Sequence, residues 1–147
     1  MKTIILSAIL LFTISAEYTS AQKKNLDKLP EKERKEYLLK KAKETIMEYG
    51  PDWYRDYKEP VIRLIVIDLG PDKGRSFYSV GYLYDPNKEQ MEYSEYSVGV
   101  GIYADTGEVR GISFGDGISY NLSSETKTRN GGKEKLPVRP CPSPKPN

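Results

Sequence analysis

Acidic side chains are the residues of this sequence whose spacing is most compatible with catalysis. Asp52 and Asp56 lie four positions apart, and Glu92 and Glu95 lie three apart. Most glycosidases hydrolyse the glycosidic bond with two carboxyl groups about 5–10 Å apart across a cleft. Asp116 lies in a Gly-Asp-Gly turn, where an aspartate ordinarily stabilises the bend. The sequence therefore leaves open a carbohydrate-acting enzyme that uses Asp52, Asp56 or Asp116.

The composition excludes several other kinds of chemistry. The chain of 147 residues has no histidine and a single cysteine, Cys141. Histidine-based triads, ordinary zinc sites and disulfides within the chain are therefore excluded. Asp68 and Asp72 lie near a Gly-rich turn, but the residue spacing of a calcium-binding loop is absent. The formal net charge of +2 gives no strong attraction to nucleic acid, and we expect neither a metal nor a cofactor.

The two ends of the chain differ in composition from its middle. Residues 1–21 have the form of a secretory signal peptide, with Lys2 before an apolar run and small residues up to Ala21. This run is shorter than the roughly 20 residues that span a bilayer. We expect export to the periplasm or the medium, with no membrane span after cleavage. Residues 123–147 hold five of the ten prolines and six basic against two acidic residues, which predicts a disordered tail.

The remaining residues, 22–122, have the pattern of a single α+β domain. Residues 30–49 are predicted to form a helix, because Pro30 suits its first turn and Gly50 its end. Strand patterns follow at 61–69, 77–84, 91–104 and 108–114, and 118–122 is a brief extension. These elements predict one N-terminal helix packed on a curved antiparallel sheet of about four strands.

Alternation along the strands predicts a sheet with two unlike faces. The face expected under the helix is apolar: Tyr78, Val80, Tyr82, Tyr84, Tyr96, Val98, Val100, Ile102, Ala104, Ile112 and Phe114. The other face carries small residues: Ser79, Gly81, Ser97, Gly99, Gly101, Gly111, Ser113 and Gly115. Glycine in a strand is disfavoured by roughly 0.5–1 kcal/mol relative to alanine. Either β-bulges or the close approach of a flat partner explains so many, and we select Gly99, Gly101 and Tyr103 as candidate ligand-binding residues.

Aromatic residues also gather just after the helix. Trp53, Tyr54 and Tyr57 lie within five positions of each other. They would either cover one end of the core or hold a peptide or a sugar. Trp53 and Tyr54 are therefore further candidates for ligand binding.

Two parts of the sequence resemble known families. Residues 102–109, Ile-Tyr-Ala-Asp-Thr-Gly-Glu-Val, resemble the final hairpin of PepSY-type domains. This resemblance implies a cystatin-like arrangement of a helix on a sheet, and it implies association with protease propeptides and inhibition, as in some members. Residues 50–60 and 109–117 resemble short exported proteins of Bacteroides-like bacteria that have no assigned function. The tyrosine-rich sheet is also similar to NTF2-fold immunity proteins, although their longer helical front end is missing.

These features together predict an exported, non-enzymatic binding module. Its partner would be a protein or a peptide, and the PepSY resemblance implies a protease as one such partner. The alternatives are the carbohydrate-acting enzyme, an NTF2-fold immunity-like protein and a purely structural protein of the cell envelope. The sequence sets no oligomeric state.

Overall fold

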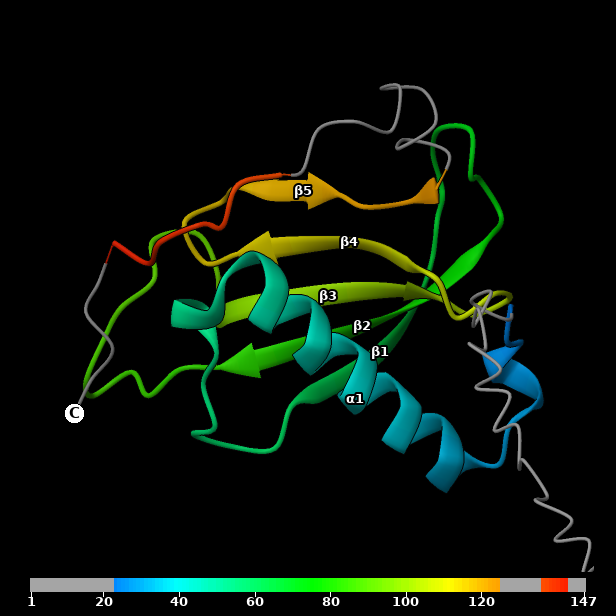
Figure 1. Cartoon of the computed structure of the whole chain (residues 1–147), viewed down its shortest axis with the longest axis horizontal. Helices are drawn as coiled ribbons and strands as arrows, with labels where there is room; N and C mark the ends of the chain where they lie inside the picture. Colours follow the sequence, from blue (N-terminus) through cyan, green and yellow to red (C-terminus); the bar gives the residue numbers. More distant parts are fainter. Residues whose placement is uncertain (1–22, 125–135, 143–147) are drawn as a thin grey trace, which may run out of the picture.

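In the part of the chain that the structure describes, five antiparallel strands form one sheet in the order of the sequence, and one α-helix packs on one face of it (Figure 1). The computed structural model describes residues 23–124 and 136–142. The strands are β1 (Val61–Val66), β2 (Ser76–Leu83), β3 (Tyr96–Tyr103), β4 (Val109–Phe114) and β5 (Ser119–Asn121). The helices are α1 (Glu31–Tyr49) and two short 3-10 turns, η1 (Leu26–Lys28) and η2 (Pro51–Trp53). The predicted α+β arrangement is confirmed, with five strands in place of about four.

The helix α1 begins and ends where its sequence signals place it. Pro30 precedes the first turn, and Gly50 ends the helix with its N–H bonded to the carbonyl of Ile46 at 2.8 Å. Leu38, Ala42 and Ile46 recur at helical spacing and are fully buried against the sheet. The helix packs on β2, β3 and β4 (Figure 1).

One β-bulge changes the face assignment at the start of β3. Val98 lies opposite Tyr82 and Tyr96 lies opposite Leu83, so one residue of β3 is extra between them. That residue is Ser97, which is fully buried and donates its hydroxyl to the carbonyl of Trp53 at 2.5 Å. Tyr96 is turned to the other face, where its ring covers Gly81. The predicted faces of Tyr96 and Ser97 are therefore both wrong, because simple alternation takes no account of the bulge.

The segment 136–142 packs on the end of the domain near the C-terminus of α1 (Figure 1). The indole N–H of Trp53 donates to the carbonyl of Arg139 at 3.1 Å, and the N–H of Arg139 donates to the carbonyl of Tyr49 at 2.7 Å. Leu136 and Cys141 lie against the core. These contacts differ from the disorder that composition predicts for residues 123–147. The rest of that tail beyond Ser124, and the proposed signal peptide, lie outside the described residues.

A buried ion pair ties the loop before β3 to the turn after α1. Arg55 donates from Nε and Nη2 to the two carboxylate oxygens of Glu89, at 2.5 and 2.8 Å. Both side chains are at most 5% exposed. Arg55 also donates to the carbonyls of Asp52 and Tyr54. Protein acceptors therefore replace water around its guanidinium group.

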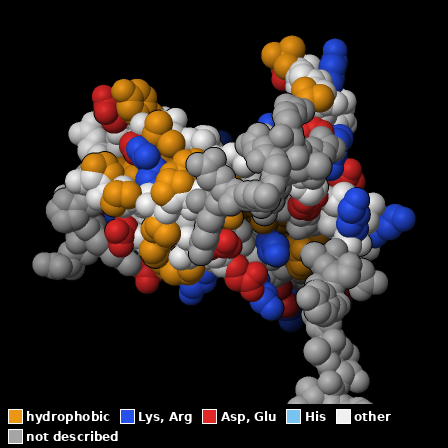
Figure 2. Space-filling view, turned by 45° about the horizontal axis from the view of Figure 1, so that its top comes forward, with side chains coloured by type: hydrophobic (Ala, Val, Ile, Leu, Met, Phe, Trp, Pro, Cys, Tyr) orange, Lys and Arg blue, Asp and Glu red, His pale blue; other side chains and the backbone are white. Residues whose placement is uncertain are grey.

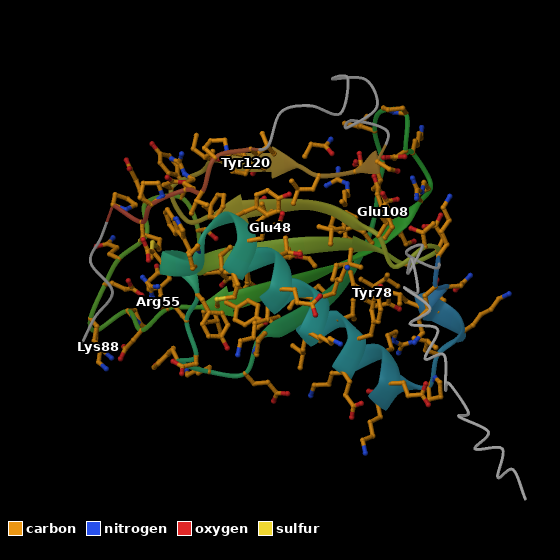
Figure 3. The ribbon with its side chains drawn as sticks, in the orientation of Figure 1. Glu48, Arg55, Tyr78, Lys88, Glu108 and Tyr120 are labelled. Atoms are coloured by element: carbon orange, nitrogen blue, oxygen red, sulfur yellow. The ribbon has the colours of Figure 1, made fainter. Side chains whose placement is uncertain are left out.

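Replacing Glu89 by alanine is expected to lower the free energy of unfolding by about 3–5 kcal/mol, because Arg55 would remain buried without a counter-ion. The control is Lys88→Ala, which removes an exposed cation 3.9 Å from Asp85 and should cost less than about 0.5 kcal/mol. Lys88 and Arg55, the ion-pair partner of Glu89, lie at the same end of the domain (Figure 3). Urea unfolding measures both changes, and similar losses for the two variants would contradict the assignment.

Candidate functional site

The face of the sheet opposite α1 is a shallow groove, and within the described residues no helix covers it. Its volume is about 610 Å³. The groove is bounded by residues from β1 to β5 and from the loop before β3, so it extends across most of the sheet. We call this surface the open face. Its floor is small and polar: Ser79, Gly99, Gly101, Gly111, Ser113 and Ser119.

Among the glycines of the floor, Gly99 has the most open space above it. Among the described residues, a Cβ atom built on Gly99 would meet only the carbonyl oxygen of Val80, 3.9 Å away, so no described side chain fills the space above it. On Gly101 the same atom would lie 3.3 Å from the ring of Phe77. Gly81, directly opposite Gly99 on β2, is already covered, because a Cβ there would lie 2.6 Å from the ring of Tyr96. The glycines therefore serve two purposes: Gly81 accommodates the chain's own tyrosine, and Gly99 leaves a free floor.

Aromatic rings paired with arginines stand on either side of this floor. The guanidinium of Arg110 lies 4.7 Å from the centre of the Phe77 ring, and that of Arg63 lies 5.8 Å from the Tyr96 ring. Such contacts hold long cationic side chains against ring faces. Tyr93 adds a further ring, 67% exposed, which rests on Gly117. The open face thus combines a flat floor with apolar walls and two positive groups.

Serine hydroxyls supply the hydrogen-bonding groups of the floor. Ser113 lies opposite Ser119 on β5, and their hydroxyls bond to each other at 2.8 Å. Ser79 lies opposite Gly101 on β3. A hydroxyl donates and accepts, so these groups suit a ligand with amide or hydroxyl groups.

By alternation along β3, Tyr103 falls on the same side of the sheet as Gly101, but its side chain is not accessible there. It is 3% exposed, its hydroxyl donates to Asp72 at 2.6 Å, and the guanidinium of Arg75 stacks on its ring at 3.8 Å. Burial and this hydrogen bond raise the pKa of Tyr103 to about 12. The hydrogen bond from Tyr103, together with Arg75, lowers the pKa of Asp72. Tyr103 therefore anchors the loop between β1 and β2 and is not a ligand contact.

Trp53 and Tyr54 do not join the open face either. Trp53 is fully buried and packs on Phe114, with ring centres 5.3 Å apart. Tyr54 packs on Tyr82, on the side of the sheet that carries α1, at 5.2 Å. Of the two interpretations of this aromatic cluster, the structure favours cover for one end of the core.

The acidic residues considered for catalysis are separated by their contacts. Asp116 forms an ion pair with Arg139 of the C-terminal segment. Asp52 and Asp56 are exposed at η2 and just after it. In the described part of the chain, no three Asp, Glu, Cys or His side chains are grouped to hold a metal ion. No described helix is long and apolar enough to cross a membrane.

A second groove, of about 430 Å³, lies between α1 and the start of β4. Glu44 and Glu48 of α1 and Glu108 beside β4 border it, together with Lys23 and Lys41. Figure 3 shows Glu48 on α1 and Glu108 next to the start of β4. Figure 2 shows acidic and basic side chains intermingled over the visible surface, without a patch of one sign.

Comparisons with known proteins give no match: no family model, no curated protein and no solved structure is significantly similar to this chain.

Sequence patterns found only part of the open face. Alternation identifies Gly99 and Gly101, whereas it places Tyr96 under the helix and does not identify Arg63 or Arg110. The bulge at Ser97 is the reason for the first error. The signal for Arg63 was available, because it alternates with Ile62 and Leu64 on β1. Alternation with Ile112 would place Arg110 under the helix, and a register shift that leaves Arg110 as an extra residue of β4 brings it to the open face.

Two glycine substitutions test the geometry of the floor. Gly99→Ala should leave the free energy of unfolding unchanged or raise it by about 0.5–1 kcal/mol, because the added methyl group meets open space. Gly81→Ala is the matched control on the neighbouring strand, and it should lower stability by about 1–3 kcal/mol because the Tyr96 ring must move. Thermal or urea unfolding measures both, and equal effects would contradict the geometry.

Proposed function

We propose that this chain is an exported binding module without enzymatic activity, and that its open face binds a segment of a partner protein or a peptide. The observation that carries the proposal is the empty floor at Gly99 between two aromatic–arginine pairs. A ligand with one flat side can approach the backbone of β3 there without displacing any described side chain.

The stability cost of the floor supports a role in binding. Gly99 lies in the middle of β3 and is paired on both sides, where glycine costs roughly 0.5–1 kcal/mol relative to alanine. The conformation of Gly99 does not require glycine, since its φ is not positive and space for a Cβ is present. A residue that stability alone would not select is best explained by an approaching ligand.

The walls indicate what the partner offers. Phe77 and Tyr96 present ring surfaces for apolar or flat groups, and such side chains are enriched at protein interfaces. Arg63 and Arg110 beside them favour carboxylate groups or backbone carbonyls of the partner. We therefore expect an extended segment with apolar and acidic side chains.

Export is the first part of the proposal to test. In a bacterial host with a general secretion pathway, the chain should accumulate outside the cytoplasm with Gln22 as its first residue. Intact-mass measurement of the purified protein gives the N-terminus directly. A cytoplasmic chain that begins at Met1 would overturn this part and leave the binding proposal standing.

Partner capture tests the open face. Purified chain coupled to a resin should retain a partner from the envelope fraction or medium of the source cells, and Gly99→Leu should reduce retention at least about tenfold by filling the floor. The control Lys40→Leu adds the same side chain on the exposed side of α1 and should retain the partner fully. Equal retention by the two variants would exclude the open face as the binding surface.

A further inference from the structure

The strand β1 (Val61–Val66) is an edge strand with an apolar surface. It pairs with β2 on one side, and no other described strand pairs with its free side. Leu64 is 55% exposed, Val66 is 62% exposed and Ile65 is 39% exposed. Arg63 is the single charged residue of the strand, and the strand contains no proline. Natural edge strands are usually protected by charges, prolines or bulges, so this edge has the character of a pairing surface.

The direction of its backbone groups follows from the adjoining hairpin. Ile67 bonds toward β2 with both groups: its N–H donates to the carbonyl of Arg75 at 2.9 Å, and its carbonyl accepts from Gly74 at 2.8 Å. Along an antiparallel strand, successive residues direct their backbone N–H and carbonyl groups alternately toward one neighbouring strand and toward the other side. Ile65 and Arg63 therefore bond toward β2, and the N–H and carbonyl groups of Ile62, Leu64 and Val66 point to the free edge.

The side chains of these same three residues lie on the face that carries α1. Leu64 is opposite Tyr78 and Ile62 is opposite Val80, two residues of the core. A groove of about 440 Å³ separates this part of β1 from α1, and Ile62, Leu64 and Leu38 contribute apolar surface to it. Tyr78 also borders this groove beside the N-terminal half of α1 (Figure 3).

We propose that β1 pairs antiparallel with β1 of a second copy of this chain, about a two-fold axis at Leu64. Symmetric pairing that keeps each face on its own side requires the axis to pass through a residue of β1, and an axis at Arg63 would place the two arginines directly opposite each other. An axis at Leu64 is the one that pairs all three outward-bonding residues with each other, with Ile62 opposite Val66 of the second copy. An axis at Ile62 would bring Pro60, which has no N–H, into the ladder opposite Leu64.

This register is self-complementary on both faces. On the helix side, Ile62, Leu64 and Val66 of the two copies form one apolar layer across the join. On the open face, Arg63 lies opposite Ile65 of the second copy, so the two arginines do not face each other. Because the two-fold axis is perpendicular to the sheet, both open faces lie on the same side of a continuous ten-stranded sheet.

The first experiment is sedimentation equilibrium of the purified chain up to about 500 µM, a range that detects dissociation constants weaker than micromolar. The wild-type chain should reach the mass of a dimer. Leu64→Lys places two ammonium groups against each other at the axis and should weaken association at least about tenfold. Leu69→Lys is the control, because Leu69 is 77% exposed in the loop beyond the strand, and it should leave association unchanged. A monomer at every concentration, or equal effects of the two variants, overturns the proposal.

A second pair of variants tests the register and does not depend on Leu64→Lys folding. Ile65→Glu would face Arg63 of the second copy at two symmetric positions, and it should tighten the dimer by about threefold or more. Ile65→Lys at the same position should weaken it by a similar factor. Equal dissociation constants for the two variants would overturn this register. Far-ultraviolet circular dichroism confirms that each variant is folded.

Discussion

The arrangement of this molecule depends on one constraint: a single helix covers less area than the sheet on which it packs. A helix with its side chains is about 10–12 Å wide, whereas five strands spaced about 4.8 Å apart extend roughly 19 Å. The buried stripe of Leu38, Ala42 and Ile46 packs on β2, β3 and β4. Residues 23–124 and 136–142 thus leave the sheet without cover in two places: on the face opposite α1, and beyond the helix at β1.

The short segments around α1 complete the core where the helix cannot. Leu26 of η1 is fully buried at one end of the domain, and its N–H donates to the carbonyl of Ala104 at 2.7 Å. At the other end, Trp53 is enclosed by Phe114 and by the backbone of Arg139. Both ends are therefore closed by residues next to α1 in the sequence, and the C-terminal segment adds to one of them. This leaves the structure without described side chains over Gly99.

Local patterns predicted the parts of this fold that depend on local physics. The helix signals at Pro30 and Gly50 and the apolar alternation of β2 correspond to the observed elements. Ser97 escaped prediction because its burial depends on an acceptor 44 positions away, the carbonyl of Trp53. The segment 136–142 escaped for the same reason, since its contacts are with Trp53, Tyr49 and Asp116 and not within itself. Composition measures what a segment can bury alone, and these contacts require a partner surface that only the fold creates.

The two uncovered regions have a joint consequence for binding. Pairing at β1 would leave the open faces untouched and place two of them side by side on one sheet. Arg63 would then lie between the two grooves, next to the Tyr96 ring of its own copy. A partner with two matching segments would bind both grooves, and the second contact would form at the high effective concentration set by the first. Weak binding at each shallow groove would therefore be compatible with firm attachment of the pair.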